Sequence, residues 1–116
     1  MQVEIELALM DATVAELKEI RRILPYGMSA ENRSAQGWGI VISTGQSSLN
    51  NPSDVVDEFL NSLHSLKEII RRHKSVLRVA IFYTTINCTI RFKSCERLAE
   101  LGLGLEISTY PVSDDE

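Results

Sequence analysis

The stretch of residues 54–83, DVVDEFLNSLHSLKEIIRRHKSVLRVAIFY, joins an amphipathic helix directly to a buried strand. In its first part apolar residues recur every three or four positions, which is the spacing of one buried helical stripe. The members of the stripe are Val56, Phe59, Leu60, Leu63, Leu66, Ile69 and Ile70. Residues 75–85 are apolar on both parities, as in a central strand. We therefore expect a long helix over residues 52–74, entered through Asn51 and Pro52, and then a strand inside a sheet.

Upstream of this stretch the pattern predicts a strand and a helix. Residues 3–9 alternate strictly, with Glu4 and Glu6 on the polar side, which is typical of a half-buried strand. A Thr-x-x-Glu capping box then precedes apolar residues at helical spacing over residues 14–24. Residues 25–37 are rich in Gly, Ser, Asn and Pro and predict a long loop.

A second strand is expected over residues 38–44, with Trp38 on the inward parity and therefore in the core. Gly37 and Gly39 either admit this bulky side chain into the core or turn the chain. Downstream, residues 87–93 alternate and predict a strand joined to the central one by a hairpin through residues 85–87.

At the C-terminal end, a short helix begins after Ser94, turns Leu98 and Leu101 inward, and ends at Gly102. A last strand follows over residues 103–110. The acidic residues 112–116 are expected to be a frayed tail.

Together these elements predict a single α+β domain over residues 1–116, with the order β-α-β-α-β-β-α-β. We expect a largely antiparallel five-stranded sheet with helices packed on one face. The polar residues of the opposite face are Glu4, Glu6, Thr89, Arg91, Lys93, Glu106, Ser108 and Tyr110. Such a face is solvated or receives a partner, and the candidate partner-binding residues are Glu4, Glu6, Glu106 and Tyr110.

Composition excludes several classes of protein. The formal net charge is −4, and 44% of the residues are hydrophobic, as in an ordinary globular protein. An acidic balance argues against nucleic-acid binding and permits a basic protein partner. No apolar run approaches the length of a membrane span, and the first residues lack the basic region of a secretory signal. We expect a cytoplasmic protein with reduced cysteines, Cys88 in the core and Cys95 at a helix entry.

Catalytic and metal-binding motifs are not evident. Cys95 lies where a thiol pKa can be lowered, but a nucleophilic cysteine needs a base. The sequence brings neither His64 nor His73 to it, and His73 fits a helix C-terminus without a further role. No zinc-ligand spacing, phosphate-binding glycine loop or calcium loop occurs. We therefore expect no enzyme, no cofactor and no metal.

The segments GWGIVISTG, DVVDEFLNSLHSLKEIIRR, VAIFY and TIRFKSCERLAELGLGLEISTYP resemble the bacterial family named domain of unknown function 4279. The resemblance spans Val3 to Pro111 and is clearest from Gly37 onward. In that family Ser-Pro-Glu stands where this chain has Ser94-Cys95-Glu96, so the Cys95 position accepts proline and is not one that chemistry requires. Residues 25–37 resemble the family least.

Members of that family are similar to small immunity proteins that bacteria encode beside toxins. The resemblance therefore implies a cytoplasmic protein that binds and neutralises a cognate toxin, with no nucleic acid or membrane as partner. An alternative is a self-associating accessory or regulatory domain, a homodimer formed through the open sheet face or an edge strand. A small-ligand enzyme or sensor is the least favoured hypothesis, because converging titratable groups are not visible.

Overall fold

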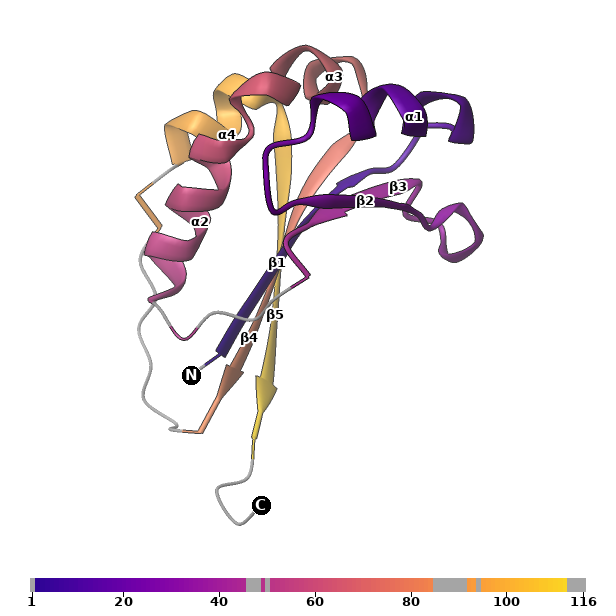
Figure 1. The fold of residues 1–116 in the computed structure, drawn as a ribbon. Helices are drawn as coiled ribbons and strands as arrows, with labels where there is room; N and C mark the ends of the chain where they lie inside the picture. Colours follow the sequence, from indigo (N-terminus) through magenta and orange to yellow (C-terminus); the bar gives the residue numbers. More distant parts are fainter. Residues whose placement is uncertain (1, 46–48, 50, 85–91, 94, 113–116) are drawn as a thin grey trace.

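The computed structural model describes residues 2–45, 49, 51–84, 92–93 and 95–112. Within these ranges the chain forms a five-stranded sheet and four α-helices, which confirms the α+β class (Figure 1). In chain order the elements are β1 (Gln2–Leu9), α1 (Val14–Ile23), β2 (Ser29–Asn32), β3 (Ile40–Ser43), α2 (Pro52–Ser62), α3 (Lys67–Arg72), β4 (Ser75–Tyr83), α4 (Cys95–Leu101) and β5 (Leu103–Pro111). Short 3-10 helices occupy Ser34–Gln36 and His64–Leu66.

The sheet has the order β2-β3-β1-β4-β5 and is mixed. β1 is antiparallel to both β3 and β4, whereas β5 is parallel to β4, with Leu103 opposite Ser75. The prediction of a largely antiparallel sheet is therefore wrong. The reason is the crossover through α4, which returns the chain to the starting end of β4, so that β5 runs in the same direction.

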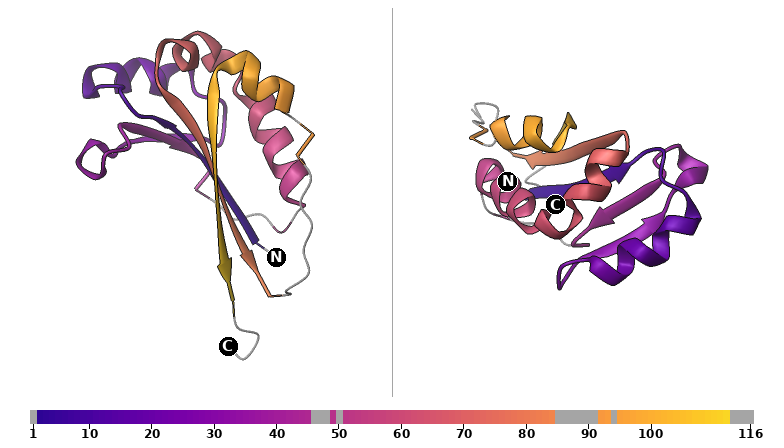
Figure 2. Two further views of the ribbon diagram at one scale, coloured as in Figure 1. Left: turned by 180° about the vertical axis from the view of Figure 1, so that it is seen from behind. Right: turned by 90° about the horizontal axis from the view of Figure 1, so that it is seen from above.

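One hydrophobic core lies between the helices and one face of the sheet. The predicted stripe of the long helical region is buried throughout, from Val56 to Ile70. It packs in one cluster with alternate residues of β1 and β4, such as Leu7 and Leu77, and with Ile20 of α1. Figure 2 shows the far ends of β4 and β5 extending past this helix layer. None of the described helices combines the length and the apolar character that a membrane span requires.

Two predicted segments differ from the structure near the helices. The loop predicted over residues 25–37 contains β2, which has the polar sequence SAEN and gains its strand conformation by pairing with β3. The predicted long helix is divided into α2, a 3-10 turn and α3. Two serine hydroxyls hydrogen-bond to main-chain carbonyl oxygens at this division. Ser62 donates to the carbonyl of Phe59 at 2.6 Å, and Ser65 donates to the carbonyl of Ile23 at 3.0 Å.

The predicted strand over residues 87–93 and its hairpin lie mostly outside the described residues. Its last two positions, Phe92 and Lys93, are described and are not in a strand. Ser94, the predicted helix cap, also lies outside them, but Gly102 follows α4 with φ of +67°, as predicted for a helix end. The predicted element order is therefore not confirmed.

Trp38 is not in the core, contrary to the prediction. β3 begins only at Ile40, and Gly39 before it has φ of +66°, which breaks the alternation that placed Trp38 inward. The Trp38 ring lies instead over the guanidinium of Arg78, 3.7 Å from the Arg78 Cζ to the ring centroid. Gly37 has φ of +86°. Of the two roles predicted for Gly37 and Gly39, the structure therefore shows turning of the chain and not admission of Trp38 into the core.

Candidate functional site

The helix-free face of the sheet carries a hollow of about 460 Å³. Most of the side chains there come from alternate positions of β1, β4 and β5, the parity opposite to the core, and Arg33 and Ser43 line the hollow as well. All four residues predicted to bind a partner line this hollow, namely Glu4, Glu6, Glu106 and Tyr110. Ser108 also lines it, whereas Lys93 lies outside the strands, and Thr89 and Arg91 lie outside the described residues. The structure thus brings the predicted residues together on one surface.

A row of charges crosses this face on three neighbouring strands. Register places Arg78 of β4 opposite Glu6 on one side and opposite Glu106 on the other. The Arg78 guanidinium donates to Glu6 through Nη1 and to Glu106 through Nε, the latter at 3.3 Å. With the Trp38 ring against it, the guanidinium has an ion pair on each side and an aromatic face, which suits its planar, weakly hydrated form.

An aromatic pair lies beside the charged row. Phe82 of β4 is opposite Tyr110 of β5, and their rings are stacked with centroids 5.1 Å apart. The Tyr110 residue is 47% exposed, so that one side of this pair faces solvent at the hollow. Tyrosine and arginine are both enriched at protein-binding surfaces.

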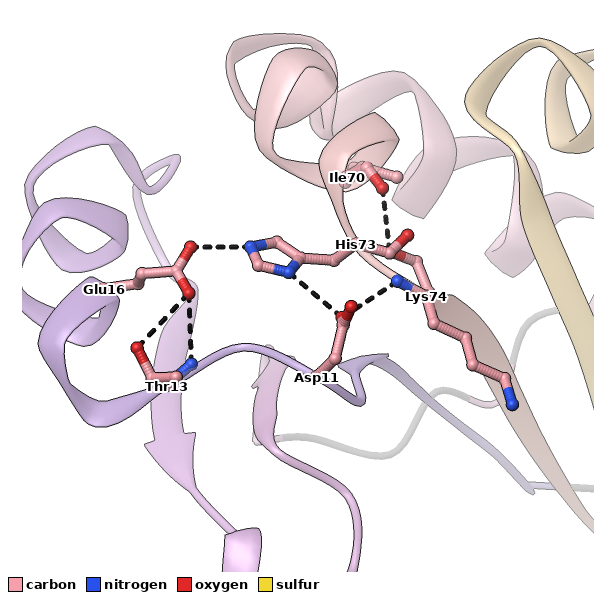
Figure 3. A network of polar contacts seen from close by, with 7 residues as sticks. Asp11, Thr13, Glu16, Ile70, His73 and Lys74 are labelled. Carbon is pink, nitrogen blue, oxygen red and sulfur yellow. Dashed lines mark hydrogen bonds and ion pairs between the residues drawn. The ribbon is translucent and has the colours of Figure 1, made fainter.

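A second polar cluster ties the start of α1 to the end of α3 (Figure 3). The His73 ring lies between two carboxylates, with Nδ1 at 3.0 Å from Asp11 and Nε2 at 2.6 Å from Glu16. Asp11 also accepts from the backbone N–H of Lys74 at 2.9 Å, and Glu16 accepts from that of Thr13 at 3.1 Å. Ionised carboxylates only accept hydrogen bonds, so both contacts are satisfied together when both ring nitrogens carry protons.

Hydrogen bonds lower the pKa of both carboxyls in this cluster. For Asp11, desolvation raises the pKa, but the backbone N–H groups of Lys74 and Asp11 and the His73 ring together outweigh it. For Glu16, the backbone N–H of Thr13 lowers the pKa most, desolvation opposes it, and the His73 ring lowers it further. Both carboxyls are therefore ionised at neutral pH, and the cluster is a hydrogen-bonded clamp between α1 and α3.

Cys95 occupies the first position of α4, as predicted, and is exposed with a free thiol. Its Sγ lies 3.8 Å from the carbonyl oxygen of Phe92. His73, one of the two possible bases, is bound by Asp11 and Glu16 instead. Cys88 lies outside the described residues. In the part of the chain that the structure describes, no group of acidic, His or Cys side chains could hold a metal ion.

Sequence reasoning missed two relationships at these sites. The alternation of residues in the strand indicates the face of the sheet on which Arg78 lies, but its two ion-pair partners depend on the strand register. The partners of His73 are 57 and 62 positions away along the chain, and no local pattern indicates them.

No family model matches this chain, and the searches of curated proteins and of solved structures also found no match.

Proposed function

We propose that the chain is a non-enzymatic protein-binding domain that receives its partner on the helix-free face. The observation that carries the proposal is the hollow in which the stacked Phe82–Tyr110 pair lies beside the Glu6–Arg78–Glu106 row. Tyrosine supplies contact area at a low entropic cost, and fixed charges select the partner and its orientation.

We further propose that the partner is a basic toxin domain and that the chain is an immunity protein acting in the bacterial cytoplasm. Two observations support this: the resemblance to domain of unknown function 4279 and the acidic balance of the chain, with three carboxylates at the hollow against Arg33 and Arg78. The activity so proposed is binding and not catalysis.

The first test is affinity purification of the tagged chain from a bacterium that encodes it, with identification of the proteins that copurify. The proposal expects one basic protein whose toxicity in a host strain is suppressed when the chain is coexpressed. Recovery of no protein with such a toxic activity would contradict the immunity hypothesis, even if other proteins were bound.

A matched pair of tyrosine variants then tests the surface. Tyr110→Ala should weaken binding by about tenfold or more, since interface aromatics commonly contribute over 1.4 kcal/mol. Tyr26→Ala is the control, because Tyr26 is fully exposed in the turn between α1 and β2 and does not line the hollow. Equal affinities of the two variants would show that the partner binds elsewhere.

A further inference from the structure

The edge strand β5 has the features of a pairing site. It lies at one end of the strand order, and the sheet ends there within the described ranges. Natural edge strands are usually short, or carry lysine, proline or a bulge that prevents pairing. The opposite edge, β2, has 4 residues, whereas β5 has 9 and contains no lysine or arginine, with Pro111 only at its last position. β5 is thus long and unprotected where β2 is short.

The apolar residues of β5 are left partly uncovered. Leu105 and Ile107 share the face of Leu77 and Val79, on which the core lies, yet they are 40% and 43% exposed. Tyr110 on the other face is exposed as well. Figure 1 shows that the second half of β5 continues beyond the helices that cover the rest of the sheet. Among the described residues no strand pairs with the outer edge of β5, so the strand offers hydrogen-bonding groups and apolar side chains together.

Charge does not oppose self-pairing at this edge. The one carboxylate of β5 is Glu106, which shares the Arg78 guanidinium with Glu6. Two copies of β5 can therefore approach without opposing like charges in any register that keeps the two Glu106 side chains apart.

We infer that a second copy of the chain pairs with the outer edge of β5, antiparallel and around a two-fold axis at Ile107. This register places Ile107 opposite its own copy and Leu105 opposite Thr109, which buries the uncovered apolar side chains against each other. On the other face it places Tyr110 opposite Gly104. A shift of one residue would place Glu106 opposite Glu106, and a carboxylate pair at the axis is unfavourable.

The inferred dimer joins the two sheets edge to edge and leaves both helix-free faces on its surface. It goes beyond the proposed function, and the two are tested separately, because the dimer is measured with the chain alone. Sedimentation equilibrium over a range of concentrations should give twice the mass of 13.0 kDa. A monomer at every concentration up to about 0.5 mM would overturn the inference, because the dissociation constant of any dimer would then be in the millimolar range or weaker.

Lysine variants locate the interface. Ile107→Lys should weaken the dimer by about 100-fold or more, because a symmetric interface receives each added charge twice. Thr109→Lys changes an exposed position of the same strand and should also weaken the dimer. It provides an independent test if the Ile107→Lys variant does not fold. Val14→Lys on α1 is the control, since Val14 is 59% exposed and distant from β5 in sequence and fold. A dimer that resists both β5 variants would place the interface elsewhere and overturn the inference.

Disulfide trapping tests the register. In a Cys88→Ser/Cys95→Ser background, Ile107→Cys should form an intermolecular disulfide on oxidation, because residues opposite each other in an antiparallel pair lie about 4.5–5.5 Å apart at Cα. Ser108→Cys should not, because its copy is displaced along the strand beyond disulfide reach. Crosslinking of Ser108→Cys in preference to Ile107→Cys would contradict the inferred axis.

Discussion

The His73 ring lies 2.6 Å from the Glu16 carboxylate, and this contact fastens the end of α3 to the first turn of α1. Asp11 binds the other ring nitrogen, and the His73 residue has a side chain only 11% exposed. The histidine therefore joins two elements that the core alone would leave free to adjust at their ends. Its interaction energy contributes to stability, which can be measured without knowledge of a partner.

Removing the ring should destabilise the fold. His73→Ala should lower the free energy of unfolding by about 1–3 kcal/mol, because the hydrogen bonds of the ring to two ionised carboxylates are lost. Urea denaturation near neutral pH measures this change. His64→Ala is the control, since His64 is exposed at the 3-10 turn and should change stability by less than about 0.5 kcal/mol. Similar losses in the two variants would show that the contacts of His73 contribute little.

The clamp should also weaken in acid. Because the pKa values of Asp11 and Glu16 are lower in the folded chain than in the unfolded chain, their contribution to stability is present above the unfolded value of about 4 and is lost as pH falls through the folded values. The stability difference between the wild type and Asp11→Asn/Glu16→Gln should therefore be present in full near neutral pH and shrink as the pH falls below about 4. Urea denaturation at several pH values checks this, and a difference that does not change with pH would contradict the assigned pKa shifts.

Local chemistry allowed parts of the fold to be predicted from sequence. The helix at Val14 follows from its capping box, and Glu16 does accept from the Thr13 backbone N–H. The start of α2 follows from Asn51, whose Oδ1 accepts from Ser53 at 2.9 Å. The buried stripe of α2 and α3 follows from its spacing alone. In each case the deciding groups lie within a few residues of one another.

The features that sequence did not predict depend on distant partners. β2 has a polar sequence of low strand propensity, and hydrogen bonds to β3 give it its conformation. The Arg78 row depends on register across β1, β4 and β5, and the parallel pairing of β5 depends on the α4 crossover. Glu4, Glu6, Glu106 and Tyr110 could be placed on one face because strand parity is local, but their common hollow required the strand order.

Gly39 and Gly37 form a matched pair for testing the turn that places Trp38 on Arg78. Both have a positive φ, but a Cβ at Gly39 would lie 2.2 Å from the Leu9 carbonyl oxygen, whereas a Cβ at Gly37 would meet no atom within 4 Å. Gly37→Ala should therefore cost about 1–2 kcal/mol of stability from backbone strain alone. Gly39→Ala should cost clearly more, because the β1 backbone must move. Thermal or urea denaturation compares them, and equal losses would show that β1 yields easily.

Arg78 should be the charge on which the helix-free face most depends. Arg78→Ala should lower the free energy of unfolding by about 2–3 kcal/mol, because it removes the Trp38 contact and leaves Glu6 and Glu106, on either side of it, without their cation. Trp38 is the only tryptophan in the sequence, so its fluorescence reports this site directly, and its emission should shift to longer wavelength as water replaces the guanidinium.

Arg72→Ala, at an exposed position of α3, is the control and should leave both stability and emission nearly unchanged. If Arg78→Ala behaved like the control, the ion pairs would be surface contacts of little energy, and the aromatic pair of Phe82 and Tyr110 would be the main fixed feature of the proposed binding face.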